Sequence, residues 1–472
     1  MRYPIIFLGL LLLVACNAYE PLAAVAVPDD WKTKVLLPSP QDTTGDPAAG
    51  LDYLLHGDYI GSGVPLEIMQ QAAPRLGGVG LLKRNELNEG IPYFMTAFTA
   101  PNGAKIANGN CFTCHAAVLP HESGAVTLTL GAGDSFGDYQ KSMVLGGVGM
   151  RLGMKLKYNK KKDDVVPAFT DFGRYFKVMA PKIKTNQPGG NPAFRLAEAC
   201  MMHRNPEDLT YSKEPLYEMW DYNIATDTPA LWHVKKKSTL YYNGIGRGSM
   251  PKLLLQASVL GTPDSTHSRK SVEAFKDVYA WLLKLDAPPY PGAVDTELAA
   301  AGQPLFEKKC AGCHGTYDDE QGHTYPNKLV NLNVVKTDRL YADYINGSGI
   351  VDWYNSSWFA TSEPRSAFVP NPGYVAPPLD GIWATAPYFH NGSVPNLYEV
   401  LNSAARTDRW TRTGSPTDYD HRRVGWNYEA GPKKKKWTFD TGLPGYGNQG
   451  HYFGDKLTED ERWAVVEYLK TL

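Results

Sequence analysis

The pattern of apolar and polar positions predicts two helices on either side of a linker. Apolar side chains recur every three or four positions over residues 272–285, which is typical of an amphipathic helix. Prolines at positions 288, 289 and 291 end this helix and stiffen the chain that follows. A second helix is expected over residues 296–309, which are rich in alanine and carry Gly302 and Phe306 one helical turn apart. The segment between them, at about residues 286–295, therefore marks a domain boundary.

The C-terminal pattern predicts a further helix over residues 458–472. Trp463, Val466 and Leu469 fall on one helical face. Thr458 with Glu461 has the spacing of a capping box, which satisfies two backbone donors at a helix start. We expect this helix to pack across the one at residues 296–309.

The chain begins with an apolar run, residues 5–15, that follows Arg2 and is too short to span a bilayer. This pattern predicts a signal peptide over residues 1–15. The run ends in Leu-Val-Ala before Cys16, which resembles a bacterial lipoprotein cleavage box, so Cys16 is the candidate lipidation site. We expect a periplasmic protein held to a membrane by its lipid. The alternative is an ordinary signal peptide and a secreted protein.

The 472 residues are 43% hydrophobic and 21% charged, with a net charge of -1. These values describe a globular chain of two or three domains and give no reason to expect a nucleic-acid partner. Lysine runs occur at residues 160–162, 235–237 and 433–436. They are either solvated loops or a surface that steers an acidic redox partner.

The pentapeptide Cys-x-x-Cys-His occurs twice, and this spacing indicates covalent attachment of haem c. In each copy the cysteines bind the haem vinyl groups and the histidine is the proximal iron ligand. A zinc site would need more cysteine and histidine nearby than the chain offers. The predicted cofactor-binding residues are Cys111, Cys114 and His115, and Cys310, Cys313 and His314.

Of the six cysteines, four bind haem in this interpretation, Cys16 takes lipid and Cys200 remains. No intramolecular disulfide is expected. Residues 199–203 contain Cys200, Met201 and His203, which are conceivable iron ligands. The alternative is that they belong to the core of a helix.

Two further segments match between the halves of the chain. Residues 231–243 and 379–391 both begin at Leu and end at Asn twelve positions later, so Tyr242 corresponds to His390. The predicted fold is mainly α, with two class I cytochrome c-like haem domains packed together, long loops and an insert in the first domain. The predicted boundaries are 1–15 for the signal peptide, 16–85 for an N-terminal extension, 86–290 for the first domain and 291–472 for the second.

Residues 376–392, which include Tyr388, Phe389 and His390, resemble a motif of the bacterial di-haem cytochrome c peroxidase superfamily. Residues 393–398, the Leu231–Trp232 pair with the lysines at 235–237, and residues 450–454 are more similar to its rubber-oxygenase-like branch. The resemblance covers roughly residues 90–472.

The resemblance implies a division of labour between the two haems. The haem at His115 would have an open or displaceable site where peroxide or dioxygen reacts, and the haem at His314 would transfer electrons. The peroxidases carry a methionine ligand after the Tyr-Phe-His motif, but residues 397–405 contain none. A histidine is therefore expected opposite His314. His451, between glycines, is the first candidate and His390 the second.

The opposite face of the first haem is less defined. His203, His233 and Met201 are candidate ligands, whereas Trp232 and Tyr242 could line an open pocket and are the candidate catalytic residues. Members of the superfamily often hold calcium between the domains. No loop here has the spacing of a calcium site, and Ca²⁺ is kept as an alternative.

Two functions remain open. The first is an exported di-haem oxidoreductase, peroxidase-like or oxygenase-like, in which the His314 haem feeds the reactive His115 haem. The insert between Cys114 and Thr228 would build a substrate channel. The second is a di-haem electron-transfer lipoprotein in which both irons have six ligands. The expected partners are a small redox protein or membrane donor and, for the enzyme, peroxide or dioxygen. The resemblance also implies that a homodimer can form.

Overall fold

The computed structural model describes residues 30–138, 166–182, 185, 187–224, 226–318, 322–431 and 435–472. The expected signal peptide at residues 1–15 and the expected lipidation site Cys16 lie outside these ranges. Helices account for 37% of the chain and strands for 16%. The two cytochrome c-like domains and their boundaries stay predictions. None of the described helices is long and apolar enough to cross a membrane.

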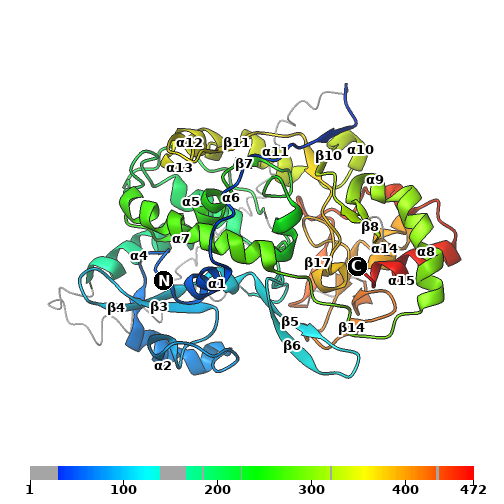
Figure 1. Ribbon diagram of the computed structural model, residues 1–472, viewed down its shortest axis with the longest axis horizontal. Coiled ribbons are helices and arrows are strands. Elements are labelled where there is room, and N and C mark those ends of the chain that lie inside the picture. The colour runs from blue at the N-terminus through cyan, green and yellow to red at the C-terminus, as the bar shows by residue number, and fades with distance from the viewer. Residues whose placement is uncertain are drawn as a thin grey trace, which may run out of the picture.

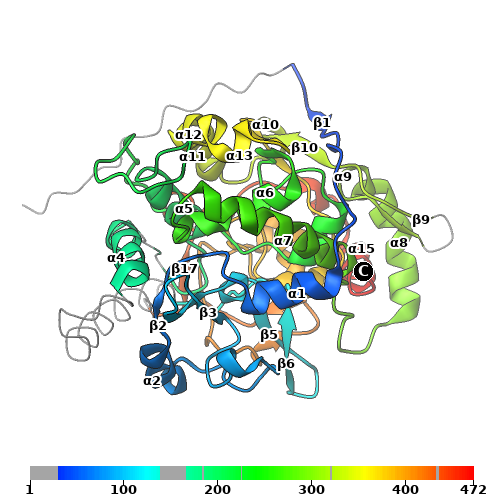
Figure 2. The same ribbon diagram turned by 60° about the vertical axis from the view of Figure 1, so that its left-hand side comes forward.

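Two long helices organise the first half of the chain. Helix α7 (Ser265–Lys284) contains the helix expected over residues 272–285. Helix α1 (Pro47–His56) lies alongside it in both views (Figure 1, Figure 2). The two backbones are in direct contact, because a Cβ added at Gly50 would lie 2.1 Å from the carbonyl oxygen of Asp277. Only glycine permits this approach, so the sequence Gly50-Leu-Asp-Tyr-Leu54 determines where the helices meet.

The second half contains an equivalent pair. Helix α8 (Thr296–Lys309) confirms the helix expected there, and α15 (Glu459–Leu469) confirms the C-terminal helix and its capping box at Thr458. A Cβ added at Gly302 would lie 2.0 Å from the carbonyl oxygen of Ala464, so these backbones also touch. Phe306 packs against Tyr468 with ring centroids 5.2 Å apart. The expected packing of the two helices is therefore confirmed.

Short strands and helices fill the rest of the first half. One sheet has the order β2–β4–β3, and β5 and β6 form a hairpin directly after His115. The bounds are β2 (Val64–Pro65), α2 (Leu66–Leu76), β3 (Met95–Thr99), β4 (Lys105–Gly109), β5 (Ala116–Pro120), β6 (Val126–Leu130), α4 (Val166–Met179), α5 (Ala193–Met201), η3 (Leu231–Lys236), β7 (Gly246–Gly248) and α6 (Met250–Leu255).

The halves are joined by strand pairing as well as by side chains. Strand β7 pairs with β11, and β1 near the N-terminus pairs with β10, which pairs with β12. The bounds are β1 (Thr33–Val35), α9 (Ala311–His314), β8 (Thr316–Asp318), β9 (Gly322–Thr324), β10 (Lys328–Asn331), α10 (Leu332–Val335), α11 (Leu340–Gly347), α12 (Ile350–Ser356), α13 (Trp358–Thr361), β11 (Ser366–Phe368), β12 (Gly373–Val375), η5 (Ile382–Thr385), α14 (Leu397–Val400), β13 (Arg409–Thr411), β14 (Tyr419–Asp420), β15 (Gly425–Trp426), β16 (Glu429–Ala430), β17 (Thr438–Asp440) and η7 (Tyr452–Gly454).

Two large apolar clusters form the core. One packs α1, α5 and α7 of the first half against α11–α13 of the second. The other surrounds α8, α15 and η5 and includes Trp232 from the first half. Since each cluster draws residues from both halves, burial of apolar surface stabilises the halves against each other.

Candidate functional site

Each Cys-x-x-Cys-His motif forms one helical turn. The backbone nitrogens of His115 and His314 each donate to the carbonyl of the first cysteine of their motif, Cys111 and Cys310, over 3.0 Å. Positions i, i+3 and i+4 of such a turn face the same side, so both cysteines and the histidine point the same way. Among the described residues no cysteine is paired in a disulfide. The cysteines of the two motifs are therefore not engaged in disulfides and can bond covalently to a cofactor.

Both motif histidines are oriented by a proline carbonyl. His115 Nδ1 lies 3.1 Å from the carbonyl oxygen of Pro229, and His314 Nδ1 lies 2.8 Å from that of Pro377. A carbonyl oxygen only accepts, so each Nδ1 carries the proton and each Nε2 keeps a free lone pair. Burial lowers the pKa of His115 to about 4 and that of His314 below its usual value. Both imidazoles are thus neutral and suited to bind a metal through Nε2.

The two prolines occupy the same position in the internal repeat. Pro229 precedes Leu231 by two residues, and Pro377 precedes Leu379 by two. The prolines just before the two matching segments therefore perform the same task in each half, which is to hold the motif histidine. This shared geometry supports the interpretation of the chain as a duplicated haem-binding unit.

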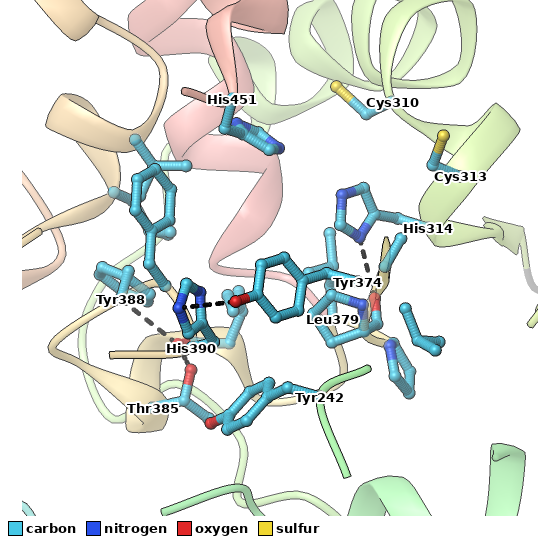
Figure 3. A pocket seen from close by; sticks show the side chains of 18 of the residues that line it. Tyr242, Cys310, Cys313, His314, Tyr374, Leu379, Thr385, Tyr388, His390 and His451 are labelled. Atoms are coloured by element: carbon cyan, nitrogen blue, oxygen red, sulfur yellow. Dashed lines mark hydrogen bonds between the residues drawn. The ribbon is translucent and has the colours of Figure 1, made fainter. Parts of the chain in front are cut away.

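His314 faces a large apolar cavity of about 240 Å³. Cys310 and Cys313 lie at its edge, and Phe306, Leu379 and Leu397 contribute apolar walls. Figure 3 shows His314 and His451 directed toward the same space. The cavity combines an apolar lining with two thiols and two neutral imidazoles, which could attach a haem c and ligate its iron.

The two imidazoles lie at the spacing of two ligands on one six-coordinate iron. The ring centroids of His314 and His451 lie 6.2 Å apart at an interplanar angle of 61°. Metal–imidazole bonds are about 2.0–2.1 Å long, so two rings on opposite sides of one metal ion have centroids about 6.4 Å apart. Burial, with the nearby His314 and Arg406, lowers the pKa of His451 to about 3. The residues present therefore fit a haem iron held between two histidines.

The loop that carries His451 is held in an uncommon backbone conformation. His451 has φ 51° and ψ 50°, the left-handed region that side chains other than glycine rarely adopt. Gly450 before it passes so close to Lys336 and Thr337 that an added Cβ would lie 2.3 Å from their backbone atoms. Arg406 donates to the carbonyls of Asn448 and Gly450 over 2.8 and 2.7 Å. These contacts determine the direction of the His451 ring.

His390, the second candidate ligand, lies elsewhere on the cavity wall. Its ring stacks on Tyr374 with centroids 4.3 Å apart, and its Nε2 lies 3.2 Å from the Tyr374 hydroxyl. Tyr242 lies beside His390, with ring centroids 6.1 Å apart, and donates to the carbonyl of Asp227. Tyr242 therefore lines the cavity of His314, although the sequence suggested it for the first haem.

Trp232 is fully buried between the two halves. Its Nε1 donates to the carbonyl of Asp380 over 2.8 Å. A Cβ added at Gly131 would touch one edge of the indole and one at Gly381 would touch another, at 3.5 and 3.4 Å. The Gly131 nitrogen donates to the carbonyl of His115. Trp232 thus lies beside Gly131, which is hydrogen-bonded to His115, and donates to Asp380, three residues after the Pro377 carbonyl that holds His314.

Equivalent positions of the repeat meet at this interface. Trp232 corresponds to Asp380, and Tyr242 corresponds to His390; each pair is in contact across the halves. Contact between equivalent positions is what a two-fold arrangement of similar units produces. The site is therefore a single assembly of both halves.

Cys200, Met201 and His203 lie apart from the His314 cavity. Cys200 and Met201 are fully buried in the core at the end of α5, and the Nδ1 of His203 lies 3.1 Å from the carbonyl of Ser212. His233 Nε2 lies 2.9 Å from the carbonyl of Asp380, so it takes part in the contact between the halves, and it also lines the His314 cavity. In the described residues no three His, Cys, Asp or Glu side chains gather as a metal cluster.

Two features of the structure were not expected from the sequence, namely helix α1 and the role of Arg406. Helix α1 lies in the expected N-terminal extension, yet it crosses α7 as α8 crosses α15. The spacing from Gly50 to Leu54, equal to that from Gly302 to Phe306, was the available signal. Arg406 gave no signal, because its partners are backbone carbonyls of a distant loop.

Comparison with known proteins identifies a cytochrome c-like segment. A family model described as RoxA-like, cytochrome c-like matches residues 373–411, which contain η5 and His390. Two curated relatives, the uncharacterized proteins y4iJ and y4iM of Sinorhizobium fredii, are 29% and 25% identical over 239 and 251 residues. These matches include 38% and 48% of this chain and 40% and 55% of the relatives, so the chain spans about half the length of the curated relatives it matches.

The match relates this chain to RoxA-like c-type cytochromes and implies that it binds haem c. The cavity around His314 offers donors for that cofactor.

Proposed function

We propose that this protein is an exported di-haem c-type cytochrome oxidoreductase of the di-haem peroxidase superfamily. The haem at His314 accepts electrons, and the haem at His115 reacts with peroxide or dioxygen. The observation that carries the proposal is the duplication of the histidine site, with Nδ1 of each motif histidine held by the proline carbonyl at the same repeat position. The export rests on the apolar run at residues 5–15 and on Cys16.

When bound, a haem iron with six ligands passes electrons and one with an open position activates an oxygen species. The protein residues around each haem would determine whether its iron has six ligands or an open position. His451 faces His314 at the spacing of a second ligand, which favours electron transfer there. The first site takes the reactive role from the resemblance to rubber oxygenases. Trp232 lies beside Gly131, which is hydrogen-bonded to His115, and donates to Asp380 of the second half, so it would provide a path between the two haems.

The test combines haem counting with low-temperature EPR of the ferric protein. Mass spectrometry of tryptic peptides should find one haem on the Cys111–His115 peptide and one on the Cys310–His314 peptide. EPR should then show one low-spin and one high-spin haem for each chain. Two low-spin haems that persist after partial reduction would contradict the enzyme and leave the electron carrier. A single haem peptide would contradict both functions.

A further inference from the structure

Three consecutive lysines follow Trp232 and His233, and their side chains have different partners. Lys235 Nζ lies 2.6 Å from a carboxylate oxygen of Asp286, and Lys236 Nζ lies 2.6 Å from one of Asp380. In the part of the chain that the structure describes, the Lys237 ammonium group makes neither an ion pair nor a hydrogen bond. Lys237 therefore differs from Lys235 and Lys236 in having no carboxylate partner among the described residues.

Lys237 lies on the wall of the cavity that contains His314. Its side chain is half-buried against the cavity, and burial lowers the pKa of the amine to about 8. Placing an ammonium group in such surroundings is unfavourable unless a negative charge accompanies it. The cavity-lining carboxyl group among the described residues, Asp227, does not supply that charge, because burial raises its pKa well above the usual value.

We infer that Lys237 binds a carboxylate of the group that fills this cavity, namely a propionate of the haem attached at Cys310 and Cys313. The inference rests on the proposed function, which places a haem there. Haem brings two propionates, and an ammonium–carboxylate pair is a strong, charge-assisted hydrogen bond in a site sheltered from water. The pairing would satisfy the one amine of the three that the protein leaves without a partner.

The consequence is a more positive reduction potential for the second haem. A positive charge beside the haem favours the reduced iron, which carries one positive charge fewer. In Lys237→Met the ratio of reduced to oxidised second haem at a fixed potential should fall about tenfold, which equals 59 mV for one electron. Spectroelectrochemical titration of the purified holoprotein measures this shift.

The matched control is Lys235→Met, which removes an adjacent lysine whose partner is Asp286. It should leave the potential unchanged, and Lys237→Arg should preserve most of it. Equal potentials in wild type and Lys237→Met, with haem present on the Cys310–His314 peptide, would overturn the inference. If Lys237→Met and Lys237→Gln fail to incorporate the second haem, incorporation by Lys237→Arg supports a need for the charge, and its failure overturns it.

The same titration separates the two sources of a carboxylate. A propionate is part of the holoprotein, so added acetate should leave the wild-type potential unchanged. A shift with acetate that disappears in Lys237→Met would show a free carboxylate at Lys237 and overturn the propionate assignment. Absence of haem from the Cys310–His314 peptide in the wild type would contradict the proposed function instead.

Discussion

At the residue scale, the fold holds two residues in states that are unfavourable on their own. They are His451, in its backbone conformation, and Glu198, in the burial of its carboxyl group. His451 occupies the left-handed backbone region at φ 51°, and non-glycine residues there cost on the order of 1 kcal/mol. Such strain persists only where surrounding contacts over-determine it, as the Arg406 and Gly450 contacts do here. The strained residue lies opposite His314, at the position proposed for the second ligand of the iron.

Replacing His451 tests its role as a ligand. In His451→Gly the backbone strain disappears, because glycine adopts positive φ freely, but the second imidazole is lost. The second haem should change from low-spin to high-spin in EPR of the ferric protein. Free imidazole at millimolar concentration should restore the low-spin signal by entering the vacated space.

The matched control is His390→Phe, which keeps a ring against Tyr374 and should keep both EPR signals. A low-spin second haem in His451→Gly without added imidazole would show that another residue is the ligand.

Glu198 is a second residue in an unfavourable state. It has no exposed surface, accepts a hydrogen bond from Tyr344 over 2.7 Å, and burial raises its pKa to about 7. The native protein therefore holds an extra proton between the ordinary pKa of 4.5 and about 7, and Glu198 lowers the free energy of unfolding as pH rises through this window.

Glu198→Gln should remove this dependence. The stability of the variant relative to wild type should rise with pH by about 1.4 kcal/mol per unit between pH 4.5 and 7. Denaturant unfolding at several pH values measures the difference. Glu207→Gln, at an exposed glutamate, is the control and should follow the wild type. Parallel curves for Glu198→Gln and wild type would contradict a raised pKa.

At the element scale, the two halves each depend on one glycine-mediated helix crossing. Gly50 lets α1 meet α7, and Gly302 lets α8 meet α15, with hypothetical Cβ contacts of 2.1 and 2.0 Å to backbone oxygens. Because a backbone atom cannot rotate away as a side chain can, these contacts determine both crossings. The helix propensity of alanine, which would favour substitution, is overridden by packing.

Gly302→Ala should therefore lower the free energy of unfolding by about 2–3 kcal/mol, as overpacking a close contact does. Gly50→Ala should have a similar effect. Gly173→Ala in α4 is the control, since no atom lies within 4 Å of its added Cβ, and it should stabilise the protein by about 0.5–1 kcal/mol. Denaturant unfolding compares the three. Equal effects at all three glycines would show that the crossings do not depend on close backbone contact.

At the scale of the whole molecule, Trp232 is one of the side chains through which the two halves meet. Its indole is fully buried, donates to the Asp380 carbonyl and lies beside Gly131, whose nitrogen donates to the carbonyl of His115. The electron transfer that we propose between the two haems would pass through this side chain.

Trp232→Phe should slow electron transfer between the haems in flash-photolysis or pulse-radiolysis measurements. Trp383→Phe is the matched control, because Trp383 is also buried and its Nε1 donates to the Pro288 carbonyl over 2.9 Å. Each variant should lose about 1–3 kcal/mol of stability, as a buried large-to-small change does, and only Trp232→Phe should lose rate. Equal rates in both variants would exclude Trp232 from the path.

The sequence by itself determined the local features of this protein. The two Cys-x-x-Cys-His turns, the helices of residues 272–285, 296–309 and 458–472, the capping box at Thr458 and the repeated Leu-to-Asn segments all follow from neighbours in the chain. Each arises from hydrogen bonds or periodicity within about fifteen residues, so its signal is contained in the sequence of that segment.

Only the tertiary structure decided which distant groups meet. In the structure His451, and not His390, lies across from His314, and Tyr242 lines the cavity of His314. Helix α1 packs against α7, and Lys237 lies on the cavity wall without an ionic partner among the described residues. These outcomes depend on close packing between segments more than a hundred residues apart. Sequence spacing carries no measure of such contacts, because many chain paths are compatible with the same local pattern.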